Sequence, residues 1–395
     1  MNIINKNNEV KTMKTVGIYV HVPFCKQKCK YCDFISFQNC ENYFDDYFEC
    51  LKKEITEKAN EINSENKEIL IDTIYFGGGT PSIVCEKYIE EVLNKIYEYY
   101  NVSENAEITV EVNPGTVDKL KLERYFEIGI NRLSIGLQST DDKLLKMLGR
   151  IHTYKEFENS YDLARKIGFK NINVDLMIGL PNQSLENVHD SLEKIVQKNP
   201  EHISVYSLII EENTKMFDLI EKGELELPDE DVERKMYWSV KKFLEENGYN
   251  HYEISNFSKS GFESKHNANC WNQHEYLGFG IAAHSYFNNI RYSNIDNLRQ
   301  YIENWKNEQS VYNIVFHEHQ NKDDMMKEFM MLGLRKIDGV KISEFKEKFV
   351  DNPIFVFRNQ LNKLVEEGLI EVLDNNIRLS DKGLDLANEV WMEFV

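Results

Sequence analysis

A series of six short apolar segments, mostly alternating with helical patterns, is the strongest constraint on the fold of this chain. Most of the segments are typical of β-strands because they are rich in β-branched and aromatic residues. The segments are residues 16–22, 70–76, 107–112, 131–136, 171–178 and 203–210. Helices are predicted between them, for example over residues 41–60 and 117–127. We therefore predict an α/β fold in which a parallel sheet carries helices outside and closes, at least in part, as a barrel.

Polar motifs lie at or directly after the carboxyl ends of these predicted strands. They are residues 77–82, 113–116, 137–139, 179–181 and 211–214. Folds built from parallel strands place their active sites at this end. Two carboxylates, Glu111 and Asp175, fall inside strands, where charged side chains are rare unless they are paired or bind a ligand. The sequence thus predicts a functional site at the carboxyl ends of the strands.

The first predicted strand runs into a loop that holds three closely spaced cysteines. Cys25, Cys29 and Cys32 are separated by three and then two residues. A structural zinc ion takes four protein ligands, and an ordinary [4Fe–4S] cluster takes four cysteines. Three thiolates on four irons would leave one iron open to a ligand from outside the protein. The alternative is a zinc knuckle that His21 or Cys40 completes.

Charge and hydropathy argue against two classes of function. The net charge of −19 argues against a general nucleic-acid binder, because phosphate contacts need clustered Lys and Arg. No apolar run approaches the roughly 18 residues of a membrane-spanning helix. Residues 1–15 lack the apolar core of a signal peptide, so we expect a disordered tail and a cytoplasmic protein. Thiols stay reduced in the cytoplasm, where clustered cysteines indicate a metal centre rather than disulfides.

The three-cysteine motif, with an aromatic residue before its third cysteine, resembles that of radical S-adenosylmethionine (SAM) proteins. In those proteins the open iron binds SAM, and an electron from the cluster cleaves it to a 5′-deoxyadenosyl radical. Within that superfamily the chain is similar to the coproporphyrinogen oxidase-type branch, which includes heme chaperones. The matching stretches are residues 19–34, 77–82, 111–116, 129–139, 148–150, 173–181 and 252–257. The resemblance is dense from about residue 16 to 290 and looser beyond.

This resemblance implies a role for each matching residue. The ligands of a [4Fe–4S] cluster would be Cys25, Cys29 and Cys32. The residues in contact with the cluster-bound SAM would be Tyr19, Gly78 and Glu111. In the oxidase relatives a second SAM is held by residues that correspond to Tyr31, Gly79, Thr80, Gln138, Arg150 and Asp175. Chemically, Arg150 could pair with a SAM carboxylate, and Asp175 could accept hydrogen bonds from ribose hydroxyls or the amino group.

Two features separate the chaperones of this branch from its oxidases. The oxidases have a longer N-terminal region and a further cysteine at the position of Phe34. The chaperones have a His-Asn-x-x-Tyr-Trp motif, which residues 266–271 resemble. The resemblance implies that His266 is a heme ligand, whereas the residues alone favour a histidine hydrogen-bonded in a loop. Cys270 replaces the usual tyrosine and could supply a thiolate ligand, while His284 is expected to be structural.

The chain divides into four predicted regions. They are a disordered tail (1–15), a partial (βα)6 radical SAM barrel (16–215), an extension with the heme-binding motif (216–315) and a winged-helix-like domain (316–395). Helical patterns followed by a hairpin around Asn375 and Asn376 predict the last domain. Its residues 323–395 hold 10 Lys and Arg against 15 Asp and Glu, which favours packing or partner docking over DNA binding.

The function expected from this resemblance is a heme chaperone with a [4Fe–4S] cluster, SAM and heme as cofactors. Heme would pass to apo-proteins such as membrane respiratory enzymes, and an electron donor would serve the cluster. The alternative is an oxygen-independent coproporphyrinogen III oxidase, an enzyme that removes carboxyl groups from propionates through the deoxyadenosyl radical. Whether the chain turns over a substrate stays open at this point.

Overall fold

A computed structural model describes residues 3–4, 10–11, 13–65 and 68–395 of the chain. The chain forms two compact units, each built from three segments. The first consists of Met1–Val174, Ile209–Leu225 and Glu275–Glu318. The second consists of Asp175–Leu208, Glu226–His274 and His319–Val395. Most of the predicted cluster and SAM residues belong to the first unit, whereas Asp175 and His266 belong to the second.

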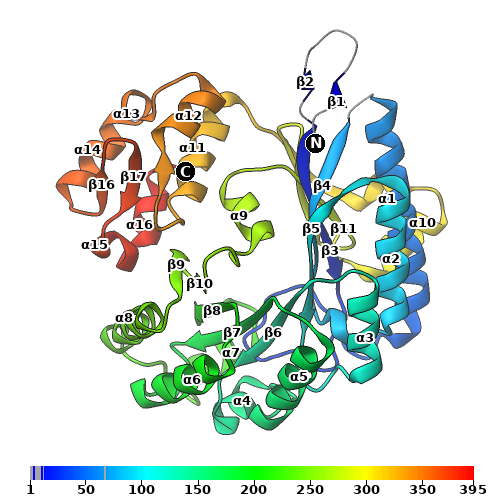
Figure 1. The fold of residues 1–395 in the computed structure, drawn as a ribbon, viewed down its shortest axis with the longest axis horizontal. Coiled ribbons are helices and arrows are strands. Elements are labelled where there is room, and N and C mark those ends of the chain that lie inside the picture. Colours follow the sequence, from blue (N-terminus) through cyan, green and yellow to red (C-terminus); the bar gives the residue numbers. More distant parts are fainter. Residues whose placement is uncertain (1–2, 5–9, 12, 66–67) are drawn as a thin grey trace. The chain divides into compact units, whose positions relative to one another are not determined.

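Parallel strands form the centre of the first unit (Figure 1). They are, in spatial order, β11 (Tyr276–Phe279), β3 (Lys14–Val22), β4 (Ile69–Gly78), β5 (Asn101–Val112) and β6 (Arg132–Gln138). Aligned buried residues fix the register, with Val20 beside Phe76 and Phe76 beside Val110. This register brings the carboxyl ends of the strands to one edge of the sheet.

Further strands extend this sheet beyond β11, the first two of them in antiparallel pairing. They are β12 (His284–Phe287), β13 (Ile290–Asn294) and β14 (Ile314–His319). A separate short pair, β1 (Ile3–Ile4) and β2 (Val10–Lys11), precedes β3. Most of the predicted disordered tail lies outside the described residues, and β3 begins at Lys14 inside the predicted range.

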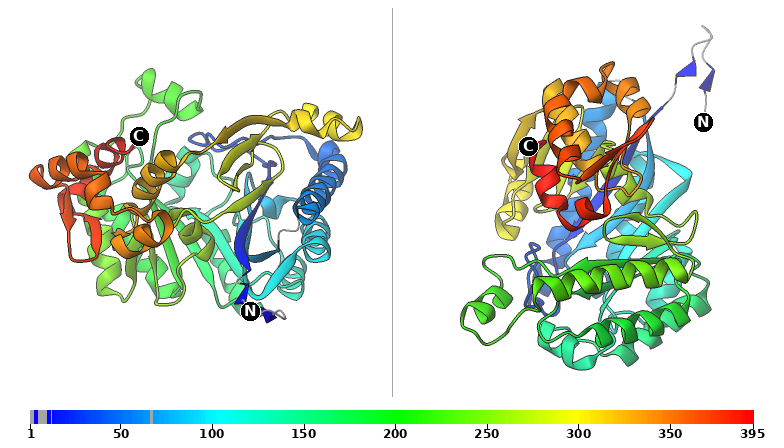
Figure 2. Two further views of the ribbon diagram at one scale, coloured as in Figure 1. Left: turned by 90° about the horizontal axis from the view of Figure 1, so that it is seen from above. Right: turned by 90° about the vertical axis from the view of Figure 1, so that its left-hand side faces the viewer.

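Helices cover the strands of the first unit, and Figure 2 shows α1, α2 and α3 beside β3, β4 and β5. The unit contains α1 (Phe44–Ser64), α2 (Glu86–Tyr99), α3 (Lys119–Glu127), α4 (Asp142–Leu148), α5 (Tyr154–Ile167), α7 (Lys215–Glu221) and α10 (Leu298–Lys306). Short 3-10 turns are η1 (Glu41–Tyr43), η2 (Pro81–Ile83) and η3 (Ser310–Asn313). Side-chain caps define several helix starts, such as the capping box of Thr153 and Glu156 on α5. Buried side chains such as Phe48 and Leu51 on α1 each stabilise the fold by roughly 1.5–3 kcal/mol.

Strand β7 (Ile172–Ile178) begins in the first unit and ends in the second. In the second unit, β8 (His202–Ser207) pairs antiparallel with β10 (Asn256–Ser258), which pairs antiparallel with β9 (Asn250–Glu253). The helices of this part are α6 (Leu185–Lys198), α8 (Glu230–Glu246) and α9 (Lys265–Trp271). The sequence Lys265–Trp271 is thus a helix, capped by the Ser264 hydroxyl, rather than a loop.

The C-terminal part of the second unit has its own apolar core, which runs from Met326 to Phe394. Its helices are α11 (Lys322–Gly333), α12 (Ile342–Phe349), α13 (Pro353–Val356), α14 (Arg358–Glu366), α15 (Asp381–Asp385) and α16 (Ala387–Met392). Its antiparallel sheet has the order β15 (Val340–Lys341), β17 (Asn376–Leu379), β16 (Ile370–Val372). The predicted fold class, parallel strands alternating with helices and a small C-terminal α+β module, is confirmed.

Candidate functional site

The loop that carries the three cysteines is fastened by backbone hydrogen bonds. Cys25 N–H donates to the carbonyl of Phe37 at 2.9 Å, and Phe37 N–H donates to Pro23 at 2.7 Å. In the middle of the loop, Lys30 N–H donates to Leu148 at the end of α4 at 2.9 Å. The loop therefore has a defined course between β3 and α1.

The thiols of Cys25, Cys29 and Cys32 are free and partly exposed. Two of them lie beside a polar side chain: the Cys25 Sγ lies 3.5 Å from the Thr80 hydroxyl, and Arg150 Nη1 donates to the Cys29 Sγ at 3.5 Å. Burial raises the pKa of the Cys25 thiol and raises the pKa of Cys32 to about 11. Binding of iron by these groups would therefore release protons.

His21, at the end of β3, holds the cysteine loop. Its Nε2 lies 2.9 Å from the carbonyl of Ile35, and its Nδ1 lies 2.9 Å from the Tyr19 hydroxyl. Burial lowers the pKa of His21 and keeps the ring neutral. Because both ring nitrogens have partners, the geometry does not favour a zinc knuckle completed by His21.

The glycines at the end of β4 are required by close packing. Gly78 has φ = +108°, and a Cβ built on it would lie 2.5 Å from ring atoms of His21. A Cβ on Gly79 would lie 2.8 Å from the backbone of Phe24. Thr80 N–H donates to the carbonyl of Phe24 at 2.8 Å. The glycine run thus lets the end of β4 lie directly against β3 and the cysteine loop.

The Glu111 carboxylate lies next to this glycine run. Its Oε1 accepts from the Tyr75 hydroxyl at 2.9 Å, and its Oε2 accepts from Gly78 N–H at 3.1 Å. Burial, and then the Glu111 charge, raise the pKa of Tyr19. The structure therefore places the three residues expected to contact the cluster-bound SAM close together: Tyr19, Gly78 and Glu111.

Arg150 follows α4 and reaches the cysteine loop. Besides the Cys29 thiol, its Nη2 donates to Asn113 Oδ1 at 2.8 Å and to the carbonyl of Gly136 at 2.6 Å. The Tyr31 hydroxyl interacts with the same guanidinium. Gln138, at the end of β6, has φ = +72° and lies beside Gly136. Such a backbone conformation costs about 1–3 kcal/mol in a non-glycine residue and is concentrated at functional sites.

Several side chains that support this site were not singled out from the sequence. Asn113 Oδ1 contacts both Arg150 and the His152 Nδ1, the latter at 3.0 Å. The Ser82 hydroxyl accepts from Asn113 N–H at 3.0 Å. Lys121 Nζ donates to the carbonyl of Ser82 at 2.7 Å. Asn113 lay within a matching motif, but nothing in the sequence indicated that His152 would reach it or that Lys121 would reach Ser82.

The remaining predicted residues lie on β7, α9 and β12. Asp175 lies on β7, and His266 lies on α9 with only 7% of its surface exposed. Cys270 follows His266 by one helical turn, so the two side chains lie on the same side of α9. His284 begins β12 in the first unit, where its side chain is exposed.

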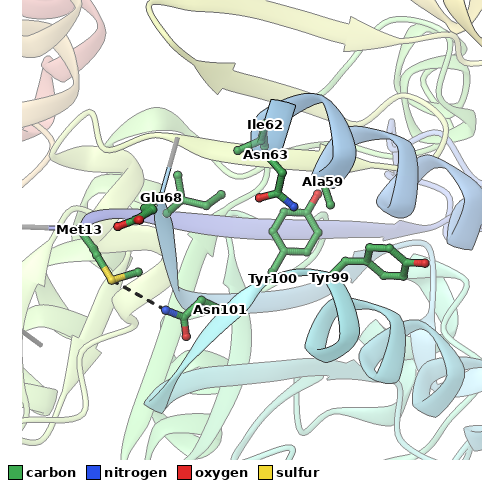
Figure 3. Close-up of a pocket in the computed structure, with 9 residues that line it drawn as sticks. Met13, Ala59, Ile62, Asn63, Glu68, Tyr99, Tyr100 and Asn101 are labelled. Atoms are coloured by element: carbon green, nitrogen blue, oxygen red, sulfur yellow. Dashed lines mark hydrogen bonds between the residues drawn. The ribbon is translucent and has the colours of Figure 1, made fainter. Parts of the chain in front are cut away.

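A separate pocket of about 240 Å³ lies at the opposite ends of the strands (Figure 3). Met13 precedes β3, Ile69 begins β4 and Asn101 begins β5, so the pocket is at their amino ends. Asn101 Nδ2 lies 3.8 Å from the Met13 Sδ. None of the predicted site residues lines this pocket.

The residues around the cysteine loop suit an iron–sulfur centre with an open iron. They combine three free thiols, hydrogen-bond partners for two of the sulfurs, and glycine backbone beside a carboxylate. Such a loop at the carboxyl end of a parallel strand, in an α/β fold, defines the radical SAM class of proteins. A family profile described as Radical SAM superfamily matches residues 19–195, and one described as HemN C-terminal domain matches residues 320–386.

Individual relatives match nearly the whole chain. The heme chaperone HemW of Bacillus subtilis (strain 168) is 37% identical over 378 residues, which cover 95% of this chain and 98% of the relative. That of Lactococcus lactis is 36% identical, with 97% and 98% covered. The chain therefore belongs to the HemW family of the radical SAM superfamily. Membership of that superfamily implies a [4Fe–4S] cluster and SAM as cofactors.

A solved structure shows the same fold. Coproporphyrinogen III oxidase (HemN) from Escherichia coli aligns with a TM-score of 0.82 and 22% identity, covering 97% of this chain and 90% of that one. In the described parts of the chain, no helix is both long and apolar enough to cross a membrane.

Proposed function

We propose that this protein is a heme chaperone that binds heme and delivers it to apo-proteins such as membrane respiratory enzymes. The main support is its similarity, over nearly the full length, to proteins described as heme chaperone HemW. An electron donor would serve the cluster, which when bound supplies the electron that cleaves SAM.

The first unit would hold the cluster and SAM. Cys25, Cys29 and Cys32 would ligate iron, and Tyr19, Gly78 and Glu111 would contact the SAM bound to it. Their grouping around the end of β4 supports these roles. Residues proposed for a second SAM are Tyr31, Gly79, Thr80, Gln138, Arg150 and Asp175. Thr80 and Arg150 each contact a cysteine sulfur, so their side chains reach the same centre.

Heme would bind at α9 in the second unit. His266 and Cys270 are one turn apart, so this helix offers an imidazole and a thiol on the same side. Because His266 is largely buried, heme would reach its imidazole only after a local rearrangement of α9 or its neighbours.

An anaerobic heme titration tests this function directly. We would titrate heme into cluster-reconstituted protein and into the variants His266→Ala and Cys270→Ser, and follow the optical spectrum. His189→Ala serves as the control because His189 is an exposed histidine of the same unit. We expect saturable binding of about one heme per chain, weakened by His266→Ala and unchanged by the control.

The other outcomes are equally informative. If heme binding were lost only in Cys270→Ser, the Cys270 thiol rather than the His266 imidazole would be the heme ligand. The absence of specific heme binding would contradict the chaperone function. Anaerobic conversion of coproporphyrinogen III by reduced, SAM-supplied protein would favour the oxidase instead, although Phe34 stands where oxidases carry a further cysteine.

A further inference from the structure

Arg150 brings a positive charge to the cysteine loop. Its partners are the Cys29 thiol, the Tyr31 hydroxyl, the Asn113 amide oxygen and the carbonyl of Gly136. Among the described residues, no Asp or Glu forms an ion pair with it. Its Nε is buried and has no hydrogen-bond partner within the described chain. A partly buried guanidinium in such surroundings is stabilised most by an anionic neighbour.

The position of Arg150 is fixed by residues that do not touch the cysteines. Asn113 Oδ1 accepts from Arg150 Nη2 at 2.8 Å and lies 3.0 Å from His152 Nδ1. Burial, and then the Arg150 charge, lower the pKa of His152 to about 3. The ring is therefore neutral at physiological pH and can donate only one hydrogen bond, either to Asn113 Oδ1 at 3.0 Å or to the carbonyl of Leu137 at 3.3 Å.

The backbone at Asn113 is itself held in place. Its N–H donates to the Ser82 hydroxyl at 3.0 Å, and its carbonyl accepts from the Thr116 hydroxyl at 2.6 Å. The two hydroxyls lie 2.6 Å apart. The side-chain amide of Asn113 therefore has little freedom to move. The Arg150 guanidinium, which donates to this amide oxygen, is held in place with it.

We propose, on the basis of the cluster assignment made above, that Arg150 is the fixed counter-charge of the iron–sulfur centre and raises its reduction potential, with Asn113 as the positioning residue. Hydrogen bonds to the sulfurs and net charge are among the factors that set such potentials. One-electron reduction by an external donor adds one negative charge to the centre and changes no bond of the protein. A cation held against the Cys29 sulfur favours the reduced form because it interacts more strongly with the additional charge.

A potentiometric titration of the cluster tests this role. Wild-type protein, Arg150→Gln, Arg150→Lys and Asn113→Ala would be reconstituted anaerobically, analysed for iron, and titrated with dithionite without SAM or heme. Electron paramagnetic resonance would measure the reduced fraction. Lys26→Gln is the matched control, because it removes one charge from the same loop at an exposed position.

We expect Arg150→Gln to lower the reduced-to-oxidised ratio at a fixed potential at least tenfold, a shift of 59 mV for one electron. Arg150→Lys keeps the charge but not the geometry, so its shift should be smaller. Asn113→Ala should shift the potential in the same direction with Arg150 still present. Lys26→Gln should change the ratio less than twofold.

Several results would overturn the proposal. They are an unchanged potential in iron-loaded Arg150→Gln, an unchanged potential in iron-loaded Asn113→Ala, or an equal shift in Lys26→Gln. If Arg150→Gln does not retain iron, the potentials of Arg150→Lys and Asn113→Ala decide whether the proposal holds. If wild-type protein did not bind about four irons per chain, the cluster assignment itself would be contradicted. The heme titration tests neither the cluster assignment nor the role of Arg150.

Discussion

At the scale of single residues, Gly78 is the position where the geometry allows least variation. Replacing it by alanine combines a strained backbone, at φ = +108°, with a Cβ 2.5 Å from the His21 ring. We expect Gly78→Ala to lower the free energy of unfolding by about 3 kcal/mol or more, the sum of a left-handed backbone and an overpacked contact. Urea denaturation of the apo-protein would measure this loss.

A matched control separates these two contributions. Gly223 lies in the same unit, also has positive φ (+68°) and has no atom of the described residues within 4 Å of its built Cβ. Gly223→Ala should therefore lose only about 1–2 kcal/mol. Equal losses in the two variants would show that contact with His21 contributes nothing.

The buried His251 should make the stability of the second unit depend on pH. Burial lowers its pKa to about 4, against an ordinary value of 6.5. The stabilising effect of the neutral ring is present above pH 6.5 and is lost as the pH falls toward 4, because the unfolded chain binds the proton first. Between these values His251 should contribute up to about 1.4 kcal/mol per pH unit.

The variant His251→Phe tests this contribution. His251 stacks on Phe257 with ring centroids 4.4 Å apart, so phenylalanine keeps the ring contact and removes the titration. Unfolding followed by tryptophan fluorescence reports mainly on the second unit, which holds Trp238, Trp271 and Trp391. A pH slope from 6.5 to 4.5 as steep as that of the wild type would rule out His251 as a source.

At the scale of elements, a stack of side chains joins α9 to α16 within the second unit. The Arg335 guanidinium lies 4.4 Å from the Trp271 ring centre and 4.7 Å from that of Trp391. Trp271 ends α9, the helix of His266 and Cys270. The stack therefore connects the proposed heme helix to the C-terminal module.

We expect Trp391→Ala to weaken heme binding about tenfold, because the loss of a partly buried cation–π contact costs about 1–2 kcal/mol and loosens α9. Trp391→Phe should restore part of the affinity. Met392→Ala, a change at the exposed next residue, is the control for the same heme titration. If Trp391→Ala and Met392→Ala bound heme with equal affinity, the contact between α9 and the C-terminal module would play no part in heme binding.

The sequence predicted some elements much better than others. All six predicted strands are present, since their pattern is local, although β5 begins six residues before its predicted start and β8 ends three residues before its predicted end. Strands β11–β14 were missed because they are short and their pairing, such as Phe279 beside Val20, depends on residues far apart in the chain. The cysteines were recognised directly because their spacing is local. The contact of His152 with Asn113 was not, because it joins residues far apart in the chain.

At the scale of the whole molecule, the cysteine loop and α9 belong to different compact units. Heme binding should therefore persist when the cluster cannot form. We expect the triple variant Cys25→Ala, Cys29→Ala, Cys32→Ala to carry no iron and to bind heme within about threefold of the wild-type affinity, a difference of less than 1 kcal/mol.

Iron analysis and the heme titration together would check this expectation. Cys40→Ala is the control for cysteine loss, because Cys40 is a free cysteine outside the three-cysteine motif. Complete loss of heme binding in the triple variant alone would place the heme site on the first unit.

The backbone bonds of the cysteine loop bear on how the centre is assembled and repaired. The amides of Cys25, Lys30 and Phe37 all donate to carbonyl groups, and none of these bonds needs a metal–sulfur bond to form. Most of the entropy of ordering the loop is therefore lost during folding, so iron enters a preformed frame. After oxidative loss of the cluster, these amides should remain protected from hydrogen exchange, and the centre should be refilled without refolding of the chain.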